Sequence, residues 1–171
     1  MKKLQFLSGI AALLLLCGCG YTFGSLSHPQ LKTVAVAPVV NDTTAYNASV
    51  ILQGLLSERF TTDGSMKLTG LKSADCIVYA RVTDVSYKAL DYGTAFDGED
   101  TFLANKWQCN ADVEFSVILP GRGKPLIANK KVTGTTKFLN GPNMETSRNN
   151  ALNQALFDAA KTIVSNITEG W

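Results

Sequence analysis

Residues that carry out catalysis are scarce in this sequence of 171 residues. Its single histidine, His28, lies in a segment predicted to be a flexible tether. Because the chain has no second histidine, no Ser-His-Asp triad can form elsewhere. No CxxC, HExxH, GxGxxG or Walker motif occurs. We therefore expect a binding or assembly protein and not an enzyme, with no metal ion and no dissociable cofactor.

Three carboxylates gather at Asp97, Glu99 and Asp100 in a predicted loop. Carboxylate oxygens are the ligands that hard cations such as Ca²⁺ prefer. Their spacing lacks the EF-hand pattern, so a solvated acidic loop is favoured over a weak cation site.

Cys19 is the residue whose surroundings indicate a definite chemistry. Lys2 and Lys3 precede an apolar stretch over 4–16, which is too short to span a membrane and ends in small residues, as in an export signal. The residues Leu16-Cys17-Gly18-Cys19 resemble the Leu-x-Gly-Cys lipobox of bacterial lipoproteins, in which cleavage before the cysteine leaves it to carry lipid. We expect removal of residues 1–18 and attachment of acyl chains, palmitate among them, to Cys19 as the one covalent lipid group.

The lipid would decide where the protein resides. Buried acyl chains contribute about 0.8 kcal/mol per CH₂, so a multiply acylated Cys19 would hold a domain at a membrane that it does not span. Gly20 follows, whereas the inner-membrane retention signal of enteric bacteria is typically Asp, which favours the outer membrane with the domain facing the periplasm. The alternative is an ordinary secretory signal with two incidental cysteines.

Length, composition and charge narrow the class of protein further. The residues are 46% hydrophobic and 18% charged, which favours one globular domain over a disordered chain. Loss of Lys2 and Lys3 with the leader leaves 14 basic and 14 acidic side chains. Because nucleic-acid binders carry a basic excess, that class is disfavoured.

Two cysteines, Cys76 and Cys109, remain in the mature chain. An oxidising periplasm favours a disulfide. If 75–90 and 105–119 form a hairpin, however, the two residues are offset by about nine positions at ~3.3 Å each, far beyond the Cα separation of a disulfide. Two buried free thiols are therefore favoured over a disulfide.

The first half of the mature chain predicts a tether, a strand and a helix. Residues 19–32 form the tether, and the β-branched run 33–40 indicates a buried strand with Pro38 near its end. Apolar residues then recur every three or four positions, which predicts an amphipathic helix that ends near Asp63-Gly64. These are Ile51, Leu52, Leu55, Leu56 and Phe60. Residues 66–69 are a candidate short strand.

Alternation of apolar and polar residues predicts three antiparallel strands, over 75–90, 105–119 and about 126–138. Pairing about the turn 120–123 sets Glu114 opposite Lys131 and Asp112 opposite Thr133. The same register turns Leu126, Ala128, Val132 and Phe138 toward the buried face.

A long C-terminal helix completes the chain, with Thr146 or Ser147 as its candidate N-cap. Its apolar stripe consists of Leu152, Leu156, Ala159, Ile163 and Ile167. The predicted fold class is α+β, a two-layer sandwich in which two helices pack on one face of a mostly antiparallel sheet of about four strands. Residues 33–171 are expected to form this single domain.

Three features together resemble the LptE family of lipopolysaccharide-assembly lipoproteins. The lipobox is followed by Gly20-Tyr21-Thr22-Phe23, the first strand leads into Asn41-Asp42-Thr43, and the first helix ends near Asp63-Gly64. The turn 117–122 also resembles members of this family. The resemblance implies an outer-membrane lipoprotein that sits inside a β-barrel of the LptD type, helps to assemble it and delivers lipopolysaccharide.

Binding of an anionic lipid A headgroup would require local cations. The candidates from charge and position are Arg122 and Lys124 at the hairpin tip and Lys130, Lys131 and Lys137 on its second strand. Each is also compatible with a solvated charge, with Lys131 paired to Glu114. Lys130 is unusual because alternation turns it toward the apolar face, where it would snorkel past a helix edge.

A second interpretation shares the same fold. Periplasmic lipoproteins that activate a cell-wall synthase or serve a secretion pore also begin with a Val-Ala-Val strand followed by Asn-x-Thr, as 34–36 and 41–43 do here. Location and partner discriminate between the two interpretations.

Overall fold

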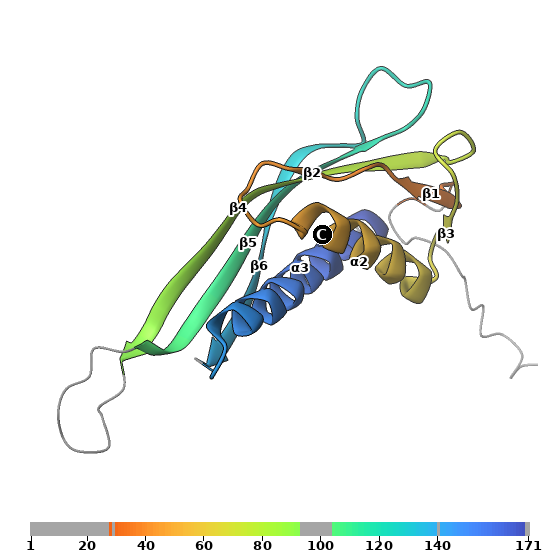
Figure 1. Cartoon of the computed structure of the whole chain (residues 1–171). Helices are drawn as coiled ribbons and strands as arrows, with labels where there is room; N and C mark the ends of the chain where they lie inside the picture. The colour runs from red at the N-terminus through yellow and green to blue at the C-terminus, as the bar shows by residue number, and fades with distance from the viewer. Residues whose placement is uncertain (1–27, 29, 93–103, 140, 170–171) are drawn as a thin grey trace, which may run out of the picture.

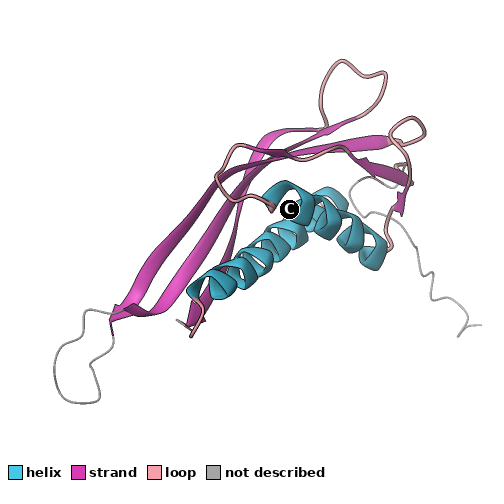
Figure 2. Ribbon diagram, viewed as in Figure 1, coloured by secondary structure: helices cyan, strands magenta, loops and turns pink. Residues whose placement is uncertain are grey.

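The computed structural model describes residues 28, 30–92, 104–139 and 141–169, which form a two-layer α+β structure. Six strands make one sheet, and two helices form the second layer on one of its faces (Figures 1 and 2). The elements in chain order are β1 Thr33–Val36, β2 Val40–Asn41, α2 Ala48–Asp63, β3 Lys67–Leu68, β4 Cys76–Tyr92, β5 Ala104–Ile118, β6 Ile127–Leu139 and α3 Met144–Thr168. The predicted fold class is confirmed, with six strands in place of about four.

The sheet is mixed, with strand order β3-β1-β4-β5-β6 and β2 paired to β4. The two pairs formed by β1 and the pair between β2 and β4 are parallel, whereas β4-β5-β6 is antiparallel. The predicted strand over 33–40 is divided into β1 and β2, and Pro38 lies between them. Proline has no N–H to donate to a neighbouring strand, which explains the interruption at this position.

The predicted register of the β5–β6 hairpin is confirmed, because Glu114 pairs with Lys131 and Asp112 with Thr133. The apolar alternation of β4 and β5 is also confirmed. Its buried members are Cys76, Val78, Ala80 and Val82 on β4 and Cys109, Ala111, Val113, Phe115 and Val117 on β5.

The prediction that Ala128 is buried was wrong, because Ala128 is exposed. The β5–β6 register shifts between Phe115 and Val117, and Asn129 adopts a positive φ of 44°. This irregularity rotates the start of β6 relative to the alternation that a regular strand would give.

Both predicted helices are present, and the N-terminus of α3 differs from the prediction. Gly64 ends α2 in the left-handed conformation, with φ of 70° and its N–H donating to the Phe60 carbonyl. The predicted N-cap of α3 was wrong. Asn143 is the N-cap, and its side-chain oxygen accepts a hydrogen bond from the Thr146 backbone N–H at 3.1 Å.

One core lies between the two layers, and α3 packs on β5 and β6 while α2 packs against α3. The predicted stripe of α3 is buried along its whole length. Leu31, assigned to the tether from sequence, is only 7% exposed and joins this core.

The outer strand β6 is fixed to α3 at two adjacent residues. Gly134 lies so close to the helix that a β-carbon would stand 1.9 Å from the Ala155 carbonyl oxygen. The Thr135 backbone N–H, on the open edge of the sheet, donates to the Asp158 carboxylate of α3 at 3.1 Å. The helix therefore both packs against β6 and satisfies part of its free edge.

We expect Gly134→Ala to destabilise the fold by about 3 kcal/mol, because the methyl group can fit only if β6 moves away from the α3 backbone. The free energy of unfolding from urea denaturation measures the effect. The matched control is Gly54→Ala on α2, where a β-carbon meets no atom within 4 Å. That change should instead stabilise the protein by ~1 kcal/mol, and equal effects of the two substitutions would contradict the close approach.

Candidate functional site

The candidate site is the face of β4, β5 and β6 that points away from the helices, here called the outer sheet face. Side chains there are the partners of the buried ones in the alternation, and they are polar along most of the strands. In the described residues no helix covers this face, as Figure 2 shows. The outer sheet face is therefore a broad surface available to a partner.

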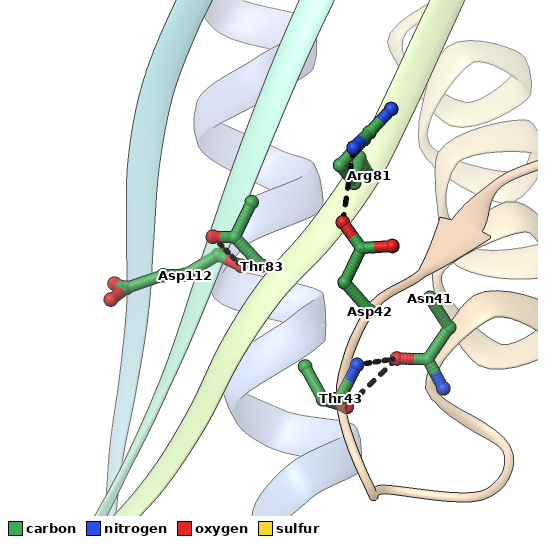
Figure 3. Close-up of polar contacts among 6 residues, drawn as sticks. All are labelled: Asn41, Asp42, Thr43, Arg81, Thr83 and Asp112. Carbon is green, nitrogen blue, oxygen red and sulfur yellow. Dashed lines mark hydrogen bonds and ion pairs between the residues drawn. The ribbon is translucent and has the colours of Figure 1, made fainter.

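One row of charged side chains crosses the outer sheet face from β4 to β6. Arg81 pairs in register with Glu114, which pairs with Lys131. Arg81 also donates from Nη1 to Asp42 Oδ2 at 3.1 Å (Figure 3). Both members of this ion pair are about half exposed, so its contribution to stability is at most ~1 kcal/mol. The charges of the row balance, which makes it locally neutral.

The loop that carries Asp42 is ordered by its own side chains. Asn41 Oδ1 accepts hydrogen bonds from the Thr43 backbone N–H at 3.0 Å and from Thr43 Oγ1 at 2.7 Å (Figure 3). The Asn41 amide also donates to the Ala45 carbonyl at 2.8 Å. These bonds form an Asx turn, which ends the strand at Asn41 and places Asp42 next to Arg81.

The next rows are held together by hydrogen bonds from hydroxyl and amide groups, one of them to a carboxylate. Thr133 Oγ1 donates to Asp112 Oδ1 at 2.6 Å, and Thr83 Oγ1 donates to the Asp112 carbonyl at 3.1 Å (Figure 3 shows Thr83). Asn110 Oδ1 accepts from Gln108 at 2.7 Å and from Thr135 at 3.2 Å. Hydroxyl and amide groups on this surface keep further donor and acceptor capacity for a partner.

The five predicted cationic residues do not form one cluster. Arg122 and Lys124 are exposed in the turn between β5 and β6, and Lys131 and Lys137 are exposed on the outer sheet face. Lys131 and Lys137 are six residues apart on one strand, which is about 20 Å. Lys131 lies opposite Glu114 in register, but no ion pair joins these two described side chains.

Lys130 points to the opposite side of the sheet from Lys131. It is half-buried beside α3, and its Nζ donates to Asn166 Oδ1 at 2.6 Å. The prediction that Lys130 turns toward the apolar face is therefore confirmed, and its ammonium group is bonded to a residue of α3 itself. This contact removes Lys130 from the surface on which Lys131 and Lys137 lie.

Sequence patterns did not point to Arg148, whose guanidinium lies 5.3 Å from the Tyr87 ring and 5.9 Å from the Trp107 ring. Tyr87 also borders a cavity of about 510 Å³ between the loop at Thr44–Asn47, β4 and the start of α3. The sequence could not indicate this contact, because the aromatic residues and Arg148 are far apart in the chain and belong to strands and a helix, which have different periodicities.

Both thiols are buried and free, which confirms the favoured interpretation. Burial raises the pKa of Cys76 to about 11, and the Asp75 carboxylate adds to the shift. Burial also raises the pKa of Cys109, which a hydrogen bond with Tyr87 partly offsets. Burial raises the pKa of Tyr87 to about 12. With their pKa values raised, Cys76 and Cys109 are poor nucleophiles at neutral pH, because the thiolate is the reactive form.

We expect Cys76 and Cys109 to resist a thiol reagent at about pH 8 in the folded protein and to react fully after unfolding. The measurement is the extent of labelling by mass spectrometry on residues 20–171, which contain no other cysteine. Rapid labelling of the folded chain would contradict the burial, and absence of labelling after unfolding without a reductant would indicate a disulfide.

Several predicted features lie outside the described residues. These are Cys19 with the leader 1–18, and the acidic residues Asp97, Glu99 and Asp100. His28, in contrast, is a described residue and lies before β1. Within the described ranges, no group of three or more His, Cys, Asp or Glu side chains is placed to hold a metal ion. In these ranges no helix combines the length and the apolarity needed to cross a membrane.

No protein-family model and no curated protein matches the sequence. Solved structures do match the fold. The rare lipoprotein B from Shewanella oneidensis is 15% identical, with 80% of this chain and 93% of that one aligned and a TM-score of 0.51. The minor lipoprotein from Acinetobacter baumannii is 12% identical over 81% and 94%, with a TM-score of 0.51. Lipoprotein B from Nitrosomonas europaea is 12% identical over 81% and 83%, with a TM-score of 0.53. The chain thus shares the fold of several bacterial lipoproteins.

Proposed function

We propose that this protein is an outer-membrane lipoprotein of the LptE type. In this role it is anchored by lipid on Cys19, faces the periplasm, associates with the lipopolysaccharide-inserting β-barrel and helps to assemble it and deliver lipopolysaccharide. The fold shared with bacterial lipoproteins and the lipobox resemblance at Cys19 both support the anchor.

The outer sheet face is the observation that carries the proposal. Its hydroxyl and amide groups and its charged side chains of both signs suit the polar interior of a large β-barrel, where plug domains are accommodated. A sheet backed by two helices is also rigid, so docking would cost little conformational entropy. The partner proposed for this face is the wall of a barrel of the LptD type.

Direct contact with lipopolysaccharide is a separate part of the proposal. Arg122 and Lys124 are exposed at the turn, and Lys131 and Lys137 are exposed on β6, so each is free to meet a phosphate of lipid A. Lys130 is the weakest candidate, because its ammonium group already donates to Asn166.

We also propose that the protein is not an enzyme and needs no cofactor beyond its covalent lipid. The support is that both thiols of the domain are buried with raised pKa values, and that His28 lies before the first strand. An assembly function requires none of these groups to react.

The barrel contact is tested by a mild-detergent pull-down of the tagged lipoprotein, with copurifying proteins identified by mass spectrometry. We expect a large β-barrel at near one-to-one stoichiometry. Ser86→Trp adds bulk to an exposed position of the outer sheet face and should lower the recovered barrel about tenfold, the effect of ~1.4 kcal/mol. Gln154→Trp, at an exposed position of α3, is the matched control and should leave recovery unchanged.

Other outcomes of the pull-down count against the proposal. Recovery of a cell-wall synthase or of a secretion pore would favour the second interpretation of the sequence. Recovery of a barrel that both tryptophan variants retain equally would place the contact elsewhere than the outer sheet face.

The anchor has its own test in Cys19→Ala. We expect the variant to leave the membrane fraction, because the acyl chains supply most of the binding free energy. Fractionation followed by immunoblotting measures the distribution, with Cys109→Ala as the control that keeps the lipid. Retention of the Cys19→Ala protein in membranes would refute lipid anchoring at this residue.

A further inference from the structure

One end of the domain carries a short basic and apolar segment, Lys67–Lys72, called here the docking loop. It begins as β3, the edge strand beside β1. The Lys67 backbone N–H donates to the Lys32 carbonyl at 2.8 Å, and the Thr69 N–H donates to the Val34 carbonyl at 2.9 Å. These bonds fix the docking loop next to the point where the chain enters the domain (Figure 1).

Two leucines of the docking loop are left in solvent although the core is close by. Leu68 is 37% exposed and Leu71 is 45% exposed, and each has an exposed lysine as its neighbour, Lys67 or Lys72. A cavity of about 390 Å³ opens beside Leu68, between β3 and the last turn of α2. Leucines flanked by lysines at a surface loop suit the boundary between lipid headgroups and acyl chains.

Basic side chains outnumber acidic ones around the docking loop, with three lysines against Asp63 at the end of α2 and Asp75. Lys32 adds a third exposed lysine, whereas the carboxylate of Asp75 is engaged by the backbone N–H groups of Lys32 and Thr33 at 3.0 and 2.9 Å. Hydrogen bonds from the Thr33 side chain and these N–H groups hold the pKa of Asp75 below its usual range, so this carboxylate stays ionised and offsets one lysine. The exposed Arg122 and Lys124 lie at the same end of the sheet, because Ile118 pairs with Ile77 at the start of β4.

The position of this end relative to the anchor selects the partner. Eleven residues separate Cys19 from Leu31, the first residue of the core, and they reach at most about 40 Å when extended. A lipid on Cys19 would therefore keep Leu31, and with it the docking loop beside Lys32, within about 40 Å of the bilayer surface. A bilayer surface that contains phospholipids with a net negative charge attracts lysines that lie near it.

We propose that the docking loop, together with Lys32, binds an anionic phospholipid surface and so fixes the orientation of the anchored domain. Leu68 and Leu71 enter the headgroup region, while Lys32, Lys67 and Lys72 contact lipid phosphates. This inference rests on the proposed lipid anchor for its setting, but the interaction itself belongs to the folded domain and requires no acyl chain.

The test uses residues 20–171, which keep every described element and the whole core. Sedimentation with vesicles of phosphatidylcholine containing about 30 mol% phosphatidylglycerol measures binding, and pure phosphatidylcholine vesicles are the comparison. We expect binding to the anionic vesicles only, with loss at about 0.5 M NaCl because salt screens the lysines.

Variants assign the effect to the docking loop. Lys67→Glu/Lys72→Glu should weaken binding by at least about twentyfold, since each lysine near the surface contributes about fivefold. Leu71→Asn should weaken it while leaving the salt dependence in place. The matched control, Lys88→Glu/Leu139→Gln, changes an exposed lysine and an exposed leucine at the far end of the sheet and should bind as the parent chain does.

The proposal is overturned if the parent chain binds neutral and anionic vesicles equally, if it binds neither, or if the control loses as much binding as the loop variants. The outcome is independent of the barrel partner. A full-length Lys67→Glu/Lys72→Glu protein should still copurify the barrel although the variant has lost vesicle binding, which would support the docking loop. If the parent protein binds anionic vesicles but recovers no barrel, the proposed function fails while the docking loop stands.

Discussion

The structure depends on one constraint, which is that the long antiparallel strands have a single apolar face and that α3 must cover it. The helix can reach β6 only because Gly134 has no side chain where the two backbones meet. Asp158 then satisfies an edge N–H of β6 one residue further on. With α3 in place, α2 has only the rest of the inner face and the side of α3 to pack against, so both helices occupy one layer.

Covering one face leaves the other to be solvated or bound. The outer sheet face meets this requirement with groups that bond to one another across the strands, such as Thr133 with Asp112 and Thr135 with Asn110. Charges alternate in one row, where Arg81 lies between Asp42 and Glu114. Like charges share two other rows, in which Asp84 pairs with Asp112 and both Lys88 and Lys137 pair with Gln108. A surface of this kind suits a polar wall along most of its length, whereas Arg122, Lys124 and Lys137 lie at or near the ends of the strands.

Most of the fold could be predicted from the sequence because its signals are local and periodic. The alternation of β4 and β5 and the register of Glu114 with Lys131 follow from side-chain period and one turn. The sequence could not predict features that depend on competing local interactions. Asn143 outcompetes Thr146 as the α3 cap, and the positive φ of Asn129 turns Ala128 outward. The docking loop was not foreseen either, since Lys32 and Lys67 come together only through the parallel pairing of β1 and β3.

The two surfaces proposed for binding lie in different parts of the same long strand, and this relation makes them compatible. The start of β4 pairs with β1 and β2 near the docking loop, whereas the remainder pairs only with β5. At ~3.3 Å per residue, the 17 residues of β4 extend over about 55 Å. A partner on the outer sheet face of the antiparallel strands therefore leaves the docking loop uncovered, and a bilayer at the docking loop leaves that face uncovered. The two contacts use different parts of one strand, so neither has to be broken for the other to form.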